Sequence, residues 1–412
     1  MEPGHWYRLS GNRPDLQLPP TPPGTRYLTD GDPACDPALN PATSLPARLR
    51  RLTGRYAKAP WSGRGDFRSI TECWNGAVLA TRFGPNGAMI CFGGGHNDYF
   101  GSDVHAFDLA ARQWSRISDG YTSGHNNAYG AGANYPTACY PDGSPLPPHT
   151  YGYVQYDPIG NDFMLLKGQQ QLGPDVVPTP IPHLFNLETK RWRRGPKHPA
   201  AALNSAGFSA WDSARRVLWG HSGDDGNSFT GFYPDGNNGD GSCGHWGPCY
   251  PSKLPHKADH NVMAYDPSRD LLLVACHQSN TLLALNPARP AEPPVVLESS
   301  SPIAISPFAA LEYSAVRERF IYYSALDGSA PYSISAPPGD DWGAWTSGCW
   351  RWQPLVSPHN TLDPIADAAR HSRYTNNNLS HTFGRFRVAR FGGREVAILV
   401  RHVDSPVYGM LL

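Results

Sequence analysis

The chain has 412 residues, and its 35 acidic residues balance its 35 basic residues, so the formal net charge at pH 7 is zero. This balance argues against a strongly basic surface of the kind that attracts nucleic acids and anionic membranes. No apolar run reaches the roughly 18 residues of a membrane span. Glycine and proline number 42 each, a content that favours many short strands joined by turns.

The N-terminal stretch MEPGHWYRLSGNRP has neither the basic start nor the apolar core of a secretory signal. We therefore expect either a cytoplasmic protein or a mature secreted or periplasmic chain whose signal has been removed. Residues 12–72 are rich in proline and lack periodicity, and we expect them to wrap around the outside of the fold. A partly ordered arm is the alternative.

One pattern recurs six times after this segment: a small or polar residue, alternating apolar positions, and then an aromatic residue that Asp often follows. The copies are WNGAVLATRF from 74, HTYGYVQYDP from 149, NSAGFSAWDS from 204, HNVMAYDP from 260, PFAALEYSAV from 307 and HTFGRFRVARF from 381. A turn and a more apolar strand follow each copy, and two further strands follow in the better-preserved units. Four short antiparallel strands per unit predict an all-β fold, a single β-propeller domain with six visible blades over residues 73–412. A seventh blade could lie in residues 10–72 or 320–380.

The two ends of the chain indicate how the ring closes. HWYRLS near the N-terminus resembles the fourth strand QWSRIS of the first unit, and the C-terminus stops at about the third strand of a unit. We therefore expect residues 1–11 to complete the last blade, which removes the exposed edges of the sheet.

The unusual loops of this sequence belong to one face of the ring. That face receives the loops between the second and third strands of each blade and the links to the next blade. They include ICFGGGHNDYFG and the inserts 118–148 and 222–259, and His149, His260 and His381 should surround the channel mouth there. Binding residues concentrate on loops that a rigid scaffold holds, so we expect the functional site on this face. The predicted substrate-binding residues are Asn97, Tyr99, His221, His277, Arg373, Tyr374, His381 and Arg401.

The unit GGGHNDYFGSDVHAFDLAARQW resembles the kelch repeats of galactose-oxidase-type propellers, but the sequence shows no convincing set of copper ligands for that oxidase. In architecture and residue types, residues 73–412 also resemble the β-propeller polysaccharide lyases, notably the ulvan lyases. That resemblance implies β-elimination from a uronic acid by a histidine, a tyrosine and an arginine, with a structural zinc nearby.

The order of these groups along the family's chain suggests His96 or His125 as the base. Tyr151, on the strand headed by His149, would be the acid, and Lys167 stands where the family has its arginine. A lysine at this position departs from the family pattern, because lysine lacks the planar guanidinium group with which arginine binds a carboxylate. The alternative cations are Arg373, Arg385 and Arg401.

Histidine suits the role of base because its pKa lies near neutrality. The expected partner is an acidic polysaccharide or oligosaccharide, and we expect a monomer that binds neither nucleic acid nor membrane.

Two alternative functions stay open. A glycoside hydrolase would need two carboxylates, for which Asp98, Asp224 and Asp225 are available, and a kelch-type module would bind carbohydrate or protein without catalysis.

A metal site is predicted in the insert 222–259, which shows no strand signal of its own. Cys243, His245, Cys249 and His260 offer the ligand types of a tetrahedral structural zinc, which would hold an irregular loop of this length in place. A Cys243–Cys249 disulfide is the alternative. Cys91 and Cys276 lie in apolar strand patterns and are expected to be buried thiols.

Overall fold

The computed structural model describes residues 1–10, 70–71, 74–94, 102–118, 139, 143–172, 175–179, 181–198, 206–221, 228–251, 254, 259–326, 328, 330–371, 382–402 and 405–412. No helix within these ranges is long and apolar enough to cross a membrane.

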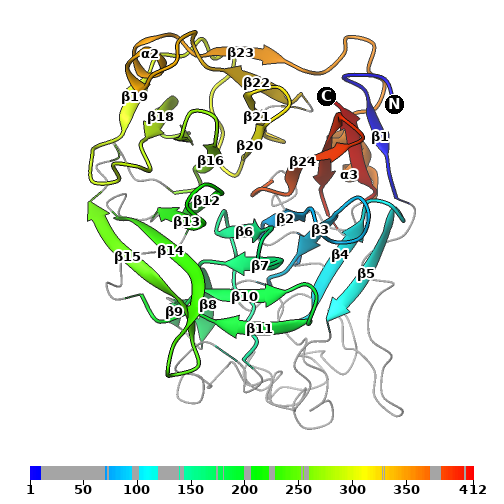
Figure 1. The fold of residues 1–412 in the computed structure, drawn as a ribbon. Coiled ribbons are helices and arrows are strands. Elements are labelled where there is room, and N and C mark those ends of the chain that lie inside the picture. Colours follow the sequence, from blue (N-terminus) through cyan, green and yellow to red (C-terminus); the bar gives the residue numbers. More distant parts are fainter. Residues whose placement is uncertain are drawn as a thin grey trace, which may run out of the picture.

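Six four-stranded antiparallel sheets surround a common centre and form a β-propeller (Figure 1). From the centre outward, the first blade is β2 (Ala77–Ala80), β3 (Ala88–Cys91), β4 (Val104–Asp108) and β5 (Gln113–Ser118). The second blade is β6 (Val154–Asp157), β7 (Asp162–Leu165), β10 (His183–Asn186) and β11 (Arg191–Arg194). A hairpin of β8 (Gly168–Leu172) and β9 (Asp175–Thr179) is inserted between β7 and β10.

The next three blades follow the same order from the centre outward. The third is β12 (Phe208–Asp212), β13 (Val217–His221), β14 (Ser228–Asn237) and β15 (Cys243–Pro251). The fourth is β16 (Val262–Asp266), β17 (Leu271–Cys276), β18 (Thr281–Leu285) and β19 (Val295–Leu297). The fifth is β20 (Ala310–Ser314), β21 (Arg319–Tyr323), β22 (Tyr332–Ser335) and β23 (Arg351–Pro354), with α2 (Trp342–Ser347) before β23.

The sixth blade confirms the predicted closure of the ring. After α3 (Pro364–His371), the chain forms β24 (Phe386–Phe391), β25 (Arg394–Val400) and β26 (Val407–Leu411). The outermost strand is β1 (Trp6–Arg8), in which Trp6 pairs with Met410, so both termini lie in this blade (N and C in Figure 1). The innermost strands β2, β6, β12, β16, β20 and β24 contact one another in a closed circuit, which fixes the number of blades at six.

The core explains why the second strands are apolar at most positions. Each of the six interfaces between neighbouring blades holds its own cluster of buried apolar side chains. In β17, Leu271 and Leu273 face the fifth blade, whereas Leu272 and Val274 face the third. A strand that is buried on both faces loses the usual alternation of apolar and polar residues. The thiols of Cys91 and Cys276 are buried as predicted, and burial raises the pKa of each to about 12.

The interpretation of residues 222–259 as an irregular loop was wrong where the structure describes them. β14 and β15 are the third and fourth strands of their blade, and they pair across two irregularities in register. Glycine and proline within SFTGFYPDGN and CGHWGPCYP hide the alternation that marks a strand, and proline is tolerated in β15 because this strand is at the edge of its sheet. The helices α2 and α3 and the hairpin β8–β9 were also not anticipated.

A buried histidine should make the stability of the fold depend on pH. His183 is 1% exposed, its Nε2 lies 3.0 Å from Cys139 Sγ, and burial lowers its pKa to about 3. Between its usual pKa and this value, the unfolded chain binds a proton that the folded protein does not. Stability should therefore fall with falling pH by up to about 1.4 kcal/mol per pH unit from this group.

We expect His183→Gln to lower the pH dependence of the urea midpoint between about pH 6.5 and pH 4, because the variant no longer has this titrating group. The matched control is His359→Gln at an exposed position, which should retain the wild-type slope. Equal slopes in His183→Gln and the wild type would contradict the assignment.

Candidate functional site

The chain enters each innermost strand through one residue in the left-handed region of backbone space. These residues have φ between 43° and 62°, and they are Trp74, Tyr151, Ala206, His260, Phe308 and Phe383. Such a conformation is costly for residues other than glycine and persists only where the surroundings enforce it. Hydrogen bonds between blades supply this constraint. The amide of Tyr151 donates to the carbonyl of Trp74 (2.8 Å), and that of His260 donates to the carbonyl of Ala206 (2.7 Å).

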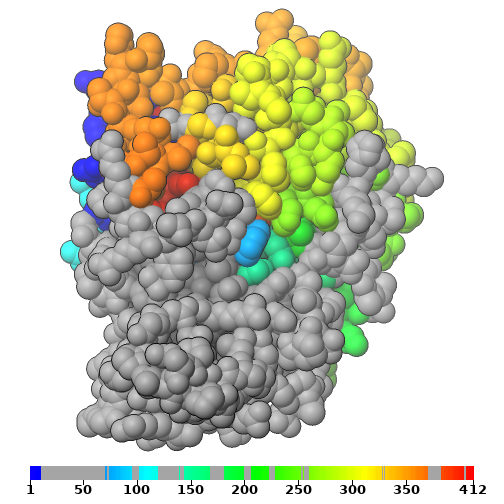
Figure 2. All heavy atoms as spheres, turned by 180° about the vertical axis from the view of Figure 1, so that it is seen from behind, coloured from blue at the N-terminus to red at the C-terminus, as the bar shows by residue number. Residues whose placement is uncertain are grey.

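Five of these six positions carry a ring, and four of the rings contact one another at this end of the channel. We call Trp74, Tyr151, His260, Phe308 and Phe383 the aromatic plug. Tyr151 lies with its ring centroid 5.7 Å from that of His260 and 6.1 Å from that of Phe383. These three residues come from the second, fourth and sixth blades, which are not neighbours, so their contacts cross the channel. In the view from behind (Figure 2), described parts of the first two blades (blue and teal) likewise meet the fourth and fifth blades (green to orange) near the middle of the face.

Two of the predicted catalytic residues lie together here: Tyr151 belongs to the aromatic plug, and His149 lies beside it. Nδ1 of His149 lies 3.4 Å from the hydroxyl oxygen of Tyr151, and the imidazole packs 4.8 Å from the ring of Trp74. Their exposed fractions are only 3% and 5%. The predicted bases His96 and His125 lie outside the described residues.

Two predicted cations lie at the same end of their blades as the plug. Lys167 follows Leu166, whose amide donates to the carbonyl of Tyr153, and Arg401 follows Val400, whose amide donates to the carbonyl of Arg385. Lys167 is fully buried and Arg401 is 3% exposed, and burial lowers the pKa of the Arg401 guanidinium. The guanidinium of the alternative cation Arg385 binds backbone groups, since it donates hydrogen bonds to the carbonyls of Asn75 and Val400. Arg373 lies outside the described residues.

The two predicted substrate-binding histidines that the structure describes have structural roles. His221 is buried at the end of β13, and its ring stacks on Phe208 with the centroids 5.0 Å apart. His277 is half-buried, its Nε2 donates to the carbonyl of Asp259 (2.7 Å), and burial lowers its pKa. The remaining predicted binding residues, Asn97, Tyr99, Arg373, Tyr374 and His381, lie outside the described part of the chain.

The four predicted zinc ligands are not brought together. Cys243, His245 and Cys249 lie along the single strand β15, while His260 belongs to the aromatic plug. Six extended residues span about 20 Å, too far for the two thiols to share an ion or a disulfide. His245 instead stacks on Tyr233. No group of three or more potential metal ligands occurs among the described residues, and the zinc stays a prediction.

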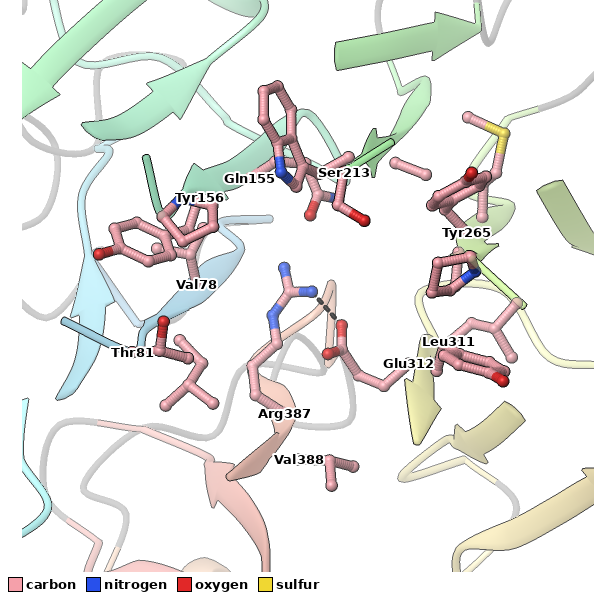
Figure 3. A pocket seen from close by; sticks show the side chains of 18 residues that line it. Val78, Thr81, Gln155, Tyr156, Ser213, Tyr265, Leu311, Glu312, Arg387 and Val388 are labelled. Atoms are coloured by element: carbon pink, nitrogen blue, oxygen red, sulfur yellow. Dashed lines mark hydrogen bonds and ion pairs between the residues drawn. The ribbon is translucent and has the colours of Figure 1, made fainter. Parts of the chain in front are cut away.

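A second candidate site lies at the other end of the channel, where the inner strands reach their first turns. It is a cavity of about 300 Å³ lined by all six innermost strands (Figure 3). We call it the turn-side cavity. Six of its lining residues occupy the same repeat position, four residues after the left-handed one: Val78, Gln155, Ala210, Ala264, Glu312 and Arg387.

Arg387 links four blades across the turn-side cavity. Its guanidinium forms an ion pair with Glu312 of β20, as Figure 3 shows. Its Nε donates to the carbonyl of Ala77 (2.9 Å), and its Nη2 donates to that of Val154 (3.4 Å). The sequence interpretation missed this pair because it assigned the unusual residues to the opposite face. Alignment of the six repeats would have revealed it, since ALEYS and FRVARF carry charges where the other copies have Val, Gln or Ala.

No protein-family model matches this chain, and no curated protein matches it significantly.

Proposed function

We propose that the protein is a polysaccharide lyase that cleaves a uronic-acid-containing polysaccharide by β-elimination at the plugged end of the channel. The observation that carries this proposal is the contact between His149 and Tyr151, 3.4 Å from ring nitrogen to hydroxyl oxygen. An imidazole and a phenol in contact can hold and pass a proton near neutral pH. Such substrates are extracellular, so the proposal implies a protein that acts outside the cytoplasm.

The reaction assigns a separate task to each group. A base removes the proton at C5 of the uronate, its electrons form the C4–C5 double bond, and the glycosidic bond at C4 breaks. We assign the proton that the leaving oxygen takes up to the hydroxyl of Tyr151. His149, which contacts this hydroxyl, can return a proton to it after each turnover. His96 and His125 remain the predicted bases.

Charge at this end of the channel favours an anionic substrate. The C5 proton is weakly acidic, and it becomes easier to remove when a cation or hydrogen-bond donor stabilises the negative charge that develops on the adjacent carboxylate. Lys167 and Arg401 are cations buried at the plugged end. In a water-poor environment, their attraction for a carboxylate exceeds that of exposed cations. The half-buried rings of Trp74 and Phe308 offer apolar surface for the C–H faces of sugars.

The test is incubation of the purified protein with a panel of uronate polysaccharides: alginate, pectate, hyaluronan, heparan sulfate and ulvan. A lyase generates an unsaturated uronate with ultraviolet absorbance at the new chain end, and we expect this absorbance on at least one polymer. New reducing ends without absorbance would indicate a glycoside hydrolase instead. Binding of a polymer without either product would indicate a non-catalytic binding module, and either result would reject the lyase proposal.

A further inference from the structure

We propose that the turn-side cavity is a second, independent binding site for a neutral, hydroxylated ligand of the size of a mono- or disaccharide. This site lies at the opposite end of the channel from His149 and Tyr151, and it does not depend on the lyase proposal. Its volume of about 300 Å³ lies at the lower end of the range for small-ligand pockets.

The charges of the cavity favour a neutral ligand. Arg387 and Glu312 are the charged residues among its lining residues, and they pair with each other. Their charges therefore cancel at short range, and a ligand with a net charge gains little attraction from the cavity. Because burial raises the pKa of Glu312 despite the neighbouring guanidinium, a second anion close to this carboxylate would be unfavourable.

The hydrogen-bonding groups favour a ligand that both donates and accepts. A guanidinium has five N–H donors, and three bonds of Arg387 are accounted for by Ala77, Val154 and Glu312. One N–H on each terminal nitrogen remains available. On the acceptor side, Glu312 bonds Arg387 through Oε1, and Gln155 uses its amide nitrogen to bond Ser209. Glu312 Oε2 and Gln155 Oε1 can therefore accept from a ligand. Hydroxyl groups match such a mixed set because each donates one bond and accepts others.

The walls of the cavity supply apolar surface beside these polar groups. Four successive blades contribute an aromatic residue at the same repeat position, namely Tyr156, Trp211, Tyr265 and Tyr313. The indole nitrogen of Trp211 is buried and has no hydrogen-bond partner among the described residues. Aromatic surface interrupted by a few convergent polar groups is typical of small-ligand sites.

A purely structural role does not account for the ion pair. The equivalent positions of three other blades hold Val78, Ala210 and Ala264, so apolar residues suffice to build this level of the channel. An ion pair that is largely withdrawn from water, as this one is, is often no more stabilising than an apolar replacement. The pair is therefore better explained by the ligand that it can bind.

The experiment measures binding of a panel of neutral saccharides by saturation-transfer NMR and calorimetry: glucose, galactose, xylose, rhamnose, maltose and cellobiose. We expect at least one to bind at millimolar concentration. Ser213→Trp places a bulky side chain at an exposed lining position and should abolish this binding without disturbing the core. Ile159→Trp is the matched control, because Ile159 lies on the β6–β7 turn of the same face, is 59% exposed and does not line the cavity.

Glu312→Gln is a second test of saccharide binding at the turn-side cavity, because it retains the shape of the side chain but removes its charge. It should weaken binding about tenfold or more, since a hydrogen bond to a charged group contributes about 1.5–3 kcal/mol. The proposal is overturned if no saccharide of the panel binds, or if Ser213→Trp binds as well as the wild type. Tighter binding of glucuronate than of glucose at this site would overturn the choice of a neutral ligand.

Discussion

Replacement of Tyr151 by phenylalanine should lower kcat for uronate cleavage by about 10²–10⁴-fold, the usual contribution of a positioned acid or base. The substitution removes only the hydroxyl that contacts His149 Nδ1. The ring keeps its contacts with His260 and Phe383, so the aromatic plug should remain closed. Initial rates of absorbance increase on the cleaved polymer measure this effect, and circular dichroism verifies the fold.

The matched control is Tyr153→Phe, two residues further along the same strand entry. Tyr153 is fully buried, and its hydroxyl donates to the carbonyl of His221 (3.0 Å). Its loss should cost about 1–3 kcal/mol of stability, because it leaves a buried acceptor without this donor, but it should leave kcat near the wild-type value. Equal losses of kcat in both variants would show that Tyr151 acts through packing. Full activity of Tyr151→Phe would exclude it as the acid.

The fold could be predicted from the sequence to the extent that the repeats share one burial pattern. The first and second strands face other blades in every copy, so runs such as DLLLVACHQ and EVAILVRH stand out. The outer strands are less constrained, and β14 and β15 contain prolines and glycines that the edge of a sheet tolerates. The closing strand was predicted because Trp6 and Arg8 repeat the pattern of β5, and the pairing of Trp6 with Met410 confirms it.

The candidate sites could be predicted less well, and the reason differs between the two ends of the channel. The plugged end brings His149 and Tyr151 together because both precede β6, so their proximity follows from local sequence. The residues Glu312 and Arg387 are 75 residues apart in the chain, so local sequence does not connect them, and only an alignment of the repeats places both at the same level of neighbouring blades. For Cys243 and Cys249, the density of ligand types suggested zinc, but an extended strand separates residues that a loop could have brought together.

Arg387→Met should be among the most destabilising single substitutions in the protein, at about 3–5 kcal/mol. It leaves the largely buried carboxylate of Glu312, whose side chain is 20% exposed, without its cation, which is the costly way to break such an ion pair. It also removes the donor to the carbonyls of Ala77 and Val154, which belong to two other blades. Urea unfolding of the variant and the wild type measures the difference.

The double variant Arg387→Met/Glu312→Leu should recover most of this loss of stability, because it removes both charges and restores the apolar character that Val78, Ala210 and Ala264 have in other blades.

The loss of stability caused by Arg387→Met alone should also depend on pH. Burial already raises the pKa of Glu312, and loss of the guanidinium should raise it further. A raised pKa in the folded state contributes stability at low pH and loses it as the carboxyl ionises. The gap between wild type and Arg387→Met should therefore widen from about pH 4 to about pH 7. A gap that stays constant with pH, together with no recovery in the double variant, would show that Arg387 stabilises the ring through its backbone bonds alone.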